Sequence, residues 1–241
     1  MANRLNIFLL IGQSNMAGRG RLNEVPQLDH PQVFMFRAGR WIAATEPLHT
    51  DKPPIAGIGL GMSFAVELIR AAGMAPVGLI PCAVGGTPLS RWMPGADLYE
   101  YAVGTARAAL PAGNLTGILW HQGENDAGNR EDAASYGERL RDMLQSLRAD
   151  LSAHSVPVVA GELGHFLRHD QGYPFFELVN RSLRELEGCL PAYACAGAEG
   201  LSDNGDFVHF DAASLREFGI RYAKRFLEMT RRDKLGEQPP A

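Results

Sequence analysis

Asp206 and His209, in the segment DFVH, have a spacing at which a carboxylate reaches an imidazole nitrogen. Such a contact fixes the tautomer of the ring and stabilises the imidazolium that forms when the histidine takes a proton. A histidine held in this way can act as a base for a serine hydroxyl, which is barely ionised at neutral pH. Ser14 stands in the segment GQSN, directly after a short apolar run. These residues indicate a nucleophile, a base and its partner, although Ser and Asn are also preferred caps of a helix start.

The other six histidines have less favourable surroundings. Three of them lie in polar loops or at helix ends and are expected on the surface: His30, His49 and His154. His121 lies at a strand end, where it would line a pocket, while His165 and His169 fall between the rim of a site and a bystander position. A metal site that uses His165, His169 and Asp170 matches no zinc or calcium spacing, so we expect no metal.

Acyl transfer also needs N–H donors that point at the oxyanion developing on the carbonyl oxygen. Gly85 and Gly86, in the segment AVGGTPLSRW, would let the backbone approach a ligand closely, although paired glycines also make ordinary tight turns. Gln122 and Asn125, in the segment HQGEND, offer side-chain amides. The sequence therefore contains both kinds of donor, and each follows an apolar run.

Two residues near these segments are expected to have structural roles. Glu124 is expected to hold the loops, through an arginine such as Arg91 or through backbone groups, rather than to react. Cys82 ends an apolar run and has no adjacent cationic residue that would lower the pKa of its thiol. We therefore place Cys82 in the core, as a small buried apolar residue.

Short apolar runs with little alternation precede most of these segments, as suits strands buried on both faces of a parallel sheet. The runs are Leu5–Ile11, Val77–Cys82, Leu115–Trp120, Val156–Gly161 and, more weakly, Ala192–Ala196. Apolar residues spaced by three and four predict helices over 60–73, 130–151, 174–188 and 211–230. Strands that alternate with helices predict an α/β fold with a parallel sheet. Ligands of such sheets bind outside the carboxyl ends of the strands, where the candidate residues lie.

The composition describes one ordinary globular domain over residues 1–241, with 46% apolar and 21% charged residues. A net charge of −4 with scattered basic residues argues against a nucleic-acid partner. No stretch approaches the roughly 20 apolar residues of a membrane span, and the run IFLLI is shorter than a signal-peptide core. Three cysteines without metal-ligand spacing favour a reducing cytoplasm. The polar residues 231–241 predict a flexible tail.

Four segments of the chain resemble, in order, blocks of the SGNH-hydrolase superfamily: GQSNMAGRG, AVGGTPLSRW, WHQGENDA and DFVHFDAAS. More narrowly, they are similar to the sialate O-acetylesterase and acetylxylan esterase branch, carbohydrate esterase family six. The resemblance extends from about Asn6 to Phe218. The G-x-S-x-G elbow of the other large serine-esterase fold is absent, because Ser14 is followed by Asn15 and Met16.

This resemblance implies a three-layer α/β/α sandwich with a five-stranded parallel sheet, as in flavodoxin-like folds. It implies that Ser14 is the nucleophile, His209 the general base and Asp206 its partner. The oxyanion hole would use the N–H groups of Ser14 and of the Gly85–Gly86 turn. Gln122 would add its amide, with Asn125 as the alternative that the wider superfamily suggests. The remaining residues of these blocks would line the pocket or support its loops: Gln13, Arg91, Trp92, His121 and Glu124.

The function that we expect from this resemblance is a serine esterase without a cofactor, which removes O-acetyl groups from a carbohydrate such as acetylated xylan or sialic acid. An esterase or thioesterase that acts on lipid or small acyl esters is a second hypothesis. A carbohydrate-binding protein without catalytic activity is a third, although it would have no need for an activated serine. The oligomeric state does not follow from these features.

Overall fold

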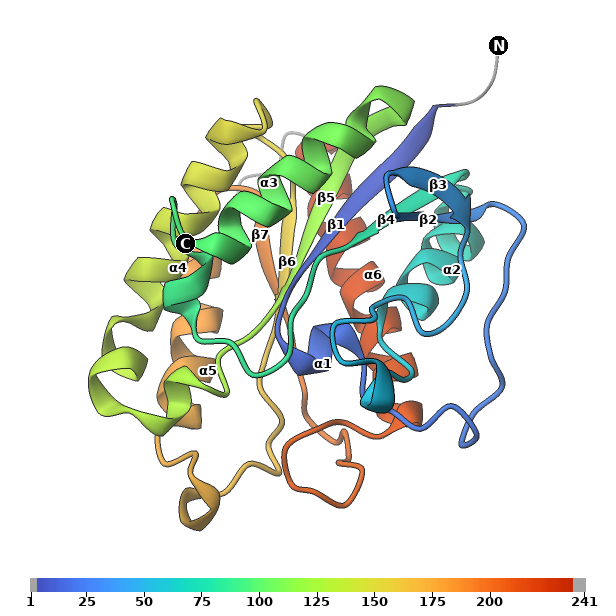
Figure 1. Ribbon diagram of the computed structural model, residues 1–241. Helices are drawn as coiled ribbons and strands as arrows, with labels where there is room; N and C mark the ends of the chain where they lie inside the picture. Colours follow the sequence, from blue (N-terminus) through green and yellow to red (C-terminus); the bar gives the residue numbers. More distant parts are fainter. Residues whose placement is uncertain (1–3, 236–241) are drawn as a thin grey trace.

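Seven strands form one sheet in the computed structural model of this chain, which describes residues 4–235 apart from the side chains of His169 and residues 232–235 (Figure 1). The strands are β1 (Leu5–Gly12), β2 (Val33–Arg37), β3 (Arg40–Ala43), β4 (Val77–Pro81), β5 (Gly113–His121), β6 (Val158–Gly161) and β7 (Tyr193–Ala196). Their order across the sheet is β3-β2-β4-β1-β5-β6-β7. All neighbouring pairs are parallel except β2 and β3.

The expected five-stranded sheet is therefore wrong in its strand number, because the β2–β3 hairpin extends one edge. β2 pairs with β4, and β3 returns antiparallel along β2. The two-residue turn between them consists of Ala38 and Gly39, which both have positive φ angles of 50° and 76°. Such a turn is usually marked by Asn-Gly or Asp-Gly. Ala-Gly between two short strands is a weaker signal, and the sequence pattern did not reveal it.

Six α-helices accompany these strands within residues 4–235: α1 (Ser14–Ala17), α2 (Gly61–Ala72), α3 (Asp97–Ala109), α4 (Arg130–Asp150), α5 (Phe176–Glu185) and α6 (Ala212–Leu235). Four of them correspond to the helices expected from the apolar spacing. The sequence pattern did not predict α3. Because α6 extends to Leu235, the first part of the expected flexible tail is helical, and residues 236–241 lie outside the described part. None of the helices described is long and apolar enough to span a membrane.

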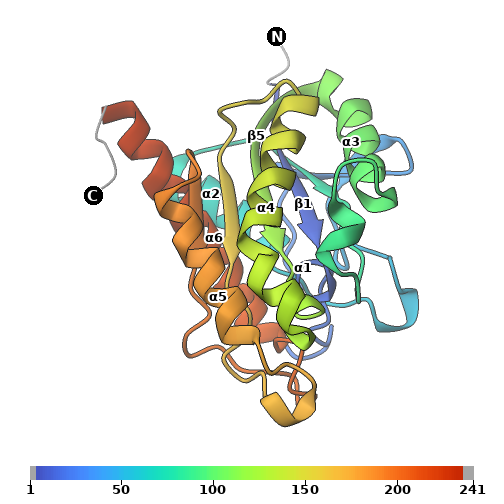
Figure 2. The same cartoon turned by 90° about the vertical axis from the view of Figure 1, so that its left-hand side faces the viewer.

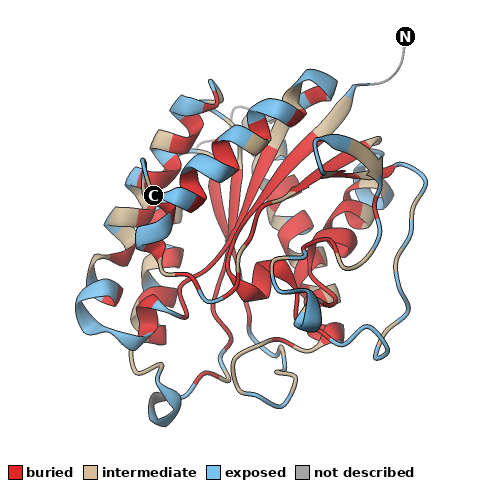
Figure 3. Ribbon diagram, viewed as in Figure 1, coloured by how far each residue is buried: buried red, intermediate tan, exposed pale blue. Residues whose placement is uncertain are grey.

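The helices cover the two faces of the sheet, as Figures 1 and 2 show from two directions. One core cluster joins the sheet to α3, α4 and α5, and a second joins it to α2 and α6. Strand β1 contributes to both: Ile7 and Leu9 lie in the first cluster, and Phe8 and Leu10 in the second. Burial on both faces places β1 at the centre of the fold (Figure 3). The three-layer α/β/α architecture is therefore confirmed.

The carboxyl end of β1 is held tightly between its neighbours. Gly12 has a φ of +130°, and a Cβ added to it would lie 2.1 Å from the carbonyl oxygen of His121, on β5. The N–H of Gln13 donates to that same oxygen at 2.8 Å, and the N–H of Val84 donates to the carbonyl of Gly12 at 3.0 Å. The chain thus enters α1 from a point that β5 and the segment after β4 fix on both sides.

Replacing Gly12 by alanine tests this constraint. Gly12→Ala is expected to lower the free energy of unfolding by about 3 kcal/mol or more, because the methyl group would overlap the backbone of β5. Gly39→Ala is the control, since Gly39 also has a positive φ but no atom within 4 Å of an added Cβ. It should lose about 1 kcal/mol. Equal losses in urea denaturation would show that the approach of β5 does not constrain Gly12.

Candidate active site

Ser14 is the first residue of α1, directly beyond the carboxyl end of the central strand β1 (Figure 1). It is 5% exposed, and its Oγ lies 3.0 Å from Nε2 of His209. The Ser14 carbonyl accepts the N–H of Gly18, which closes the single turn of α1. Its own N–H has no acceptor in the part of the chain that the structure describes. Ser14 thus lies both at a helix start and beside His209, so the two interpretations of this residue from the sequence are compatible.

His209 is oriented by Asp206. The two side chains meet at 2.6 Å, between Nδ1 and Oδ2, while Asp206 Oδ1 accepts the N–H groups of Val208 and His209 at 2.9 and 2.8 Å. Burial alone would raise the pKa of Asp206, but these hydrogen bonds hold it below its ordinary value. Asp206 is therefore ionised at neutral pH and favours a hydrogen on Nδ1, which leaves Nε2 to accept a hydrogen bond from the Ser14 hydroxyl.

The glycine turn after β4 offers one N–H rather than two. The Gly85 N–H donates to Oδ2 of Asp51 at 2.7 Å. Gly86, with a φ of +76°, is exposed, and no residue within 4–235 accepts its N–H. A Cβ on Gly85 would stand 3.3 Å from the Ser14 Cβ, so this turn passes close to the serine. The Gly86 N–H is the member of the pair that an incoming oxygen can reach without displacing a carboxylate.

The two candidate amides differ in their surroundings. Gln122 is fully buried, and its amide nitrogen has more acceptors within reach than it has hydrogens. These acceptors are Asp126 Oδ2 at 2.7 Å, the Thr87 carbonyl at 3.0 Å and Gln13 Oε1 at 3.3 Å. Asn125 is exposed, and among the described residues its side chain has no hydrogen-bond partner. Gln122 thus holds the surrounding loops through its own hydrogen bonds, and the Asn125 amide is without a protein partner among the described residues.

Arg91 and Trp92 lie outside the hydrogen-bonded centre. Trp92 is buried, donates its indole N–H to Thr87 at 3.1 Å and packs edge-on against Trp120 at 5.7 Å. Arg91 is exposed and pairs with Asp97. It therefore does not pair with Glu124, which was one of the two structural roles expected for Glu124. Trp92 thus supports the glycine-containing loop from below, whereas Arg91 stays on the surface.

Asn15 links the segment of Ser14 to the loop that carries His209, a role that the sequence pattern did not reveal. Its Oδ1 accepts the N–H of Phe210 at 3.1 Å, and its Nδ2 donates to the carbonyl of Val208 at 3.1 Å. These are the two neighbours of His209 in the chain. Nδ2 also donates to Oε1 of Glu124 at 2.5 Å. The residue next to Ser14 therefore holds the backbone on both sides of His209.

Glu124 and His121 form a buried pair beneath Asn15. Glu124 is 1% exposed, and its Oε1 lies 3.6 Å from Nε2 of His121. Burial would raise the pKa of Glu124, but His121 and Asn15 together lower it. His121 has no exposed surface, and its Nδ1 lies 3.1 Å from the hydroxyl of Tyr222. It therefore supports the site from the interior and does not line an open pocket.

His49 is buried, at 4% exposure, so its expected surface position is wrong. It lies near an ion pair between Arg19 and Asp51, whose side chains are 3% and 5% exposed and meet at 2.7 Å. Burial lowers the pKa of His49 to about 4. Burial would raise the pKa of Asp51, but Arg19 and the Gly85 N–H lower it. The segment that carries His49 and Asp51 is buried because it contacts residues distant in sequence, such as Arg19 and Gly85, and no local pattern indicates these contacts.

Asn15→Ala should separate the positioning of the base from general stability. The rate constant kcat for hydrolysis of p-nitrophenyl acetate is expected to fall about 100-fold with little change in KM, because the His209 loop loses its anchor. Asn180→Ala is the control: Asn180 is also buried and makes two hydrogen bonds to the backbone, both to Leu163. The same drop in kcat for both variants would mean that loosening of the fold is the cause.

His49 should make the stability depend on pH in a defined window. Its folded-state pKa of about 4 lies below the value of about 6.5 in an unfolded chain, so between these values only the unfolded state binds the proton. The free energy of unfolding should therefore fall by roughly 2–4 kcal/mol as the pH drops from 6.5 to 4. His49→Gln should remove this slope from the denaturation profile, while His154→Gln, at an exposed position, should keep it. A slope unchanged by His49→Gln would contradict the assignment.

Comparison with known proteins gives the family. The family described as "Carbohydrate esterase, sialic acid-specific acetylesterase" matches residues 4–228. A probable carbohydrate esterase of Arabidopsis thaliana is 32% identical, over 92% of this chain and 90% of its own length. A solved Arabidopsis thaliana structure has a TM-score of 0.86 at 30% identity, covering 94% of this chain and 99% of that one. The crystal structure of NanS shares the fold, with a TM-score of 0.75 at 19% identity, over 95% and 98%. The chain therefore belongs to this carbohydrate esterase family and is an ester hydrolase of the O-acetylesterase type.

Proposed function

We propose that this esterase removes O-acetyl groups from a carbohydrate through an acetyl-enzyme intermediate on Ser14. The observation that carries the proposal is the continuous chain from Asp206 through His209 to Ser14, with contacts of 2.6 and 3.0 Å. A carboxylate that orients a histidine, which in turn faces a serine hydroxyl, is the arrangement that activates serine for acyl transfer. Membership of a carbohydrate esterase family supports an acetylated carbohydrate as the substrate.

In the first half-reaction, Ser14 Oγ attacks the carbonyl carbon of the acetyl ester while His209 Nε2 takes the hydroxyl proton. The charge that develops on the carbonyl oxygen meets the N–H groups of Ser14 and Gly86 and the amide of Asn125. His209 then returns the proton to the sugar oxygen as the bond between that oxygen and the acetyl carbon breaks. The sugar leaves as a neutral alcohol.

In the second half-reaction, water replaces the sugar. His209 takes a proton from the water as its oxygen attacks the acetyl carbon, and the same N–H donors hold the oxyanion. The bond to Ser14 Oγ then breaks, the proton returns to the serine, and acetic acid leaves and ionises. Asp206 stays ionised throughout and stabilises the imidazolium, as its lowered pKa favours.

Two substitutions test the roles in this mechanism. Ser14→Ala is expected to lower kcat for p-nitrophenyl acetate by at least roughly 10⁴-fold, because no nucleophile remains. Asp206→Asn should lower it by about 10⁴-fold, because an amide favours the wrong tautomer of His209. Ser182→Ala, on helix α5, is the control and should behave as the parent protein does. Circular dichroism checks that each variant is folded, and full turnover by folded Ser14→Ala would overturn the mechanism.

Labelling tests the nucleophile, and the length of the acyl chain separates the competing substrate classes. A fluorophosphonate probe should label the parent protein at Ser14, and a folded protein that is not labelled would contradict the role of Ser14 as nucleophile. Acetyl esters should react faster than butanoyl and octanoyl esters of the same alcohol. A preference for octanoate would indicate an esterase of lipid substrates.

A further inference from the structure

The segment between β6 and α5, residues 162–175, packs against the loop before α6, which contains the histidine of the site (Figure 1). Two of its side chains make this contact. The Phe166 ring meets the Phe210 ring edge-on, with 4.9 Å between the ring centres. The Arg168 guanidinium lies over the Phe207 ring, 4.6 Å from its centre. The mechanism above uses neither contact.

Phe207 has a backbone conformation that residues of its size rarely adopt. Its φ angle is +58°, in the left-handed region. It stands in the turn in which Asp206 Oδ1 accepts the N–H groups of Val208 and His209 at 2.9 and 2.8 Å. Rotation about φ moves the chain after Phe207 relative to Asp206. A return of Phe207 to a negative φ would therefore take both N–H groups away from the carboxylate.

The carboxylate that closes this turn also orients the base. Asp206 Oδ2 meets Nδ1 of His209 at 2.6 Å, and Nε2 of the same ring faces Ser14 at 3.0 Å. If the turn opened, Asp206 would lose the two backbone hydrogen bonds that fix its carboxylate, and the ring of His209 would lose its fixed direction. The conformation of Phe207 is thus coupled to the geometry of the site.

Two contacts hold Phe207 in this conformation. Its N–H donates to Oδ2 of Asp203 at 2.7 Å, and its half-buried ring lies beneath Arg168. The face of an aromatic ring attracts a cation, and the attraction strengthens as the pair is removed from water. A strained conformation persists only where the surrounding structure holds it. The guanidinium therefore fixes the side chain of the residue that carries the strain.

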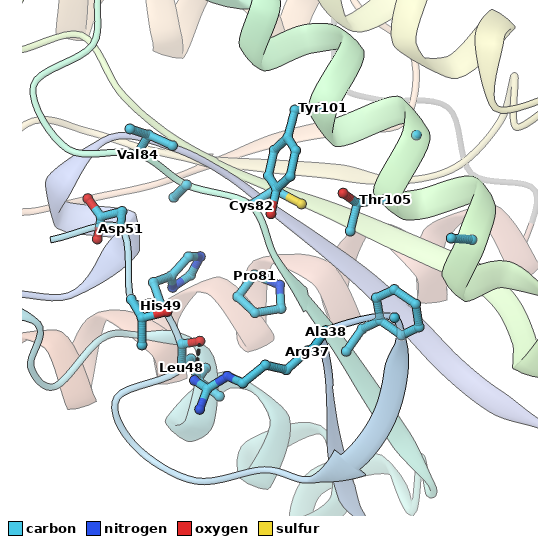
Figure 4. A pocket seen from close by; sticks show the side chains of 16 residues that line it. Arg37, Ala38, Leu48, His49, Asp51, Pro81, Cys82, Val84, Tyr101 and Thr105 are labelled. Carbon is cyan, nitrogen blue, oxygen red and sulfur yellow. Dashed lines mark hydrogen bonds between the residues drawn. The ribbon is translucent and has the colours of Figure 1, made fainter. Parts of the chain in front are cut away.

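Arg37 shows how this chain uses another arginine that has no carboxylate partner. It lies in the wall of a cavity of about 600 Å³ and donates to the carbonyls of Pro47 and Leu48 at 2.9 and 3.0 Å (Figure 4). Its guanidinium thus holds a loop through backbone hydrogen bonds. Arg168 is different, because within the described residues its guanidinium makes no hydrogen bond or ion pair and contacts the Phe207 ring.

The turn that carries Arg168 is fixed independently of its side chain. The carbonyl of Arg168 accepts the N–H groups of Gln171 and Tyr173 at 3.2 and 3.3 Å. The N–H of Phe175 donates to the carbonyl of Ala127, in the segment after β5, at 3.0 Å. A substitution of the Arg168 side chain leaves these backbone bonds in place, so its effect on the neighbouring loop can be measured.

We propose that Arg168 is a positioning residue, whose guanidinium holds the Phe207 ring and thereby the turn in which Asp206 orients His209. This inference rests on the proposed function, because it concerns the orientation of the base in that reaction. Arg168 acts through Phe207 and touches neither Ser14 nor the ester. Its loss should therefore lower the rate of the chemical steps and leave the binding of substrate unchanged.

Substitution of Arg168 tests this separation of rate from binding. Arg168→Met, which keeps the length of the side chain without the charge, should lower kcat for p-nitrophenyl acetate about 5-fold with KM unchanged. Arg168→Lys keeps a cation and should retain more than about half of kcat. Arg181→Met is the control, since Arg181 on α5 is exposed and makes no hydrogen bond or ion pair within the described residues. A raised KM with unchanged kcat would show that Arg168 binds substrate and would overturn the proposal.

A double-mutant cycle tests whether Arg168 acts through the ring of Phe207. Phe207→Leu removes the ring face and should lower kcat at least about 5-fold, whereas Phe207→Tyr keeps the face and should react as the parent protein does. In the Phe207→Leu protein, Arg168→Met should change kcat by less than about 1.5-fold, because the contact is already lost. A further 5-fold loss would mean that the two side chains act independently, which would contradict the proposal.

A measurement without turnover separates this inference from the proposed function. In the Ser14→Ala protein, the Nδ1 proton of His209 lies in a charge-assisted hydrogen bond and should give a low-field NMR signal, identified by its absence from His209→Gln. Arg168→Met should make this proton exchange with water at least about 5-fold faster, and Arg181→Met should leave the rate unchanged. Equal rates in Arg168→Met and the parent background would overturn the positioning role. Full turnover by Ser14→Ala would instead contradict the proposed function, while the exchange rate would still decide the role of Arg168.

Discussion

The hydrogen bond between Ser14 and His209 joins residues that are 195 positions apart, and the geometry of the site depends on it. It can form only because β1 ends at the centre of the carboxyl edge of the sheet and the segment before α6 returns to the same edge. Asn15 makes this return precise, since it binds the backbone on both sides of His209. Ser14 and His209 are thus held by one hydrogen-bonded unit before a substrate arrives, and such an arrangement lowers the cost of orientation in a reaction that uses both.

A layer of buried polar side chains lies beneath this unit. Glu124 and Gln122 come from the loop after β5, and both are removed from solvent. Buried polar groups are costly unless they are hydrogen-bonded, and here Glu124 meets Asn15 while Gln122 meets Asp126. Movement of the loop after β5 relative to α1 would leave such groups without partners in the interior. The polar layer therefore resists displacement in a way that an apolar layer, which has no directional contacts, would not.

The Arg19–Asp51 pair has a similar effect on the other side of the serine. Because the Asp51 carboxylate accepts the Gly85 N–H, the glycine turn is fixed in one orientation, and the Gly86 N–H stays available to a ligand.

The sequence by itself determined the α/β architecture and the close pairing of Asp206 with His209. Both depend on local patterns: the apolar runs and helical spacing follow from which faces are buried, and three residues of chain bring the carboxylate to the ring. The β2–β3 hairpin escaped this reasoning because its turn and its short strands give weak signals, and α3 was not recognised in advance. Only the tertiary structure decided that His49 is buried, that Glu124 meets Asn15 and His121 rather than Arg91, and that Asn125 rather than Gln122 has a free amide. Each of these depends on which distant segments meet at the edge of the sheet, and burial and hydrogen-bond partners arise from those meetings rather than from the neighbours of a residue in the chain.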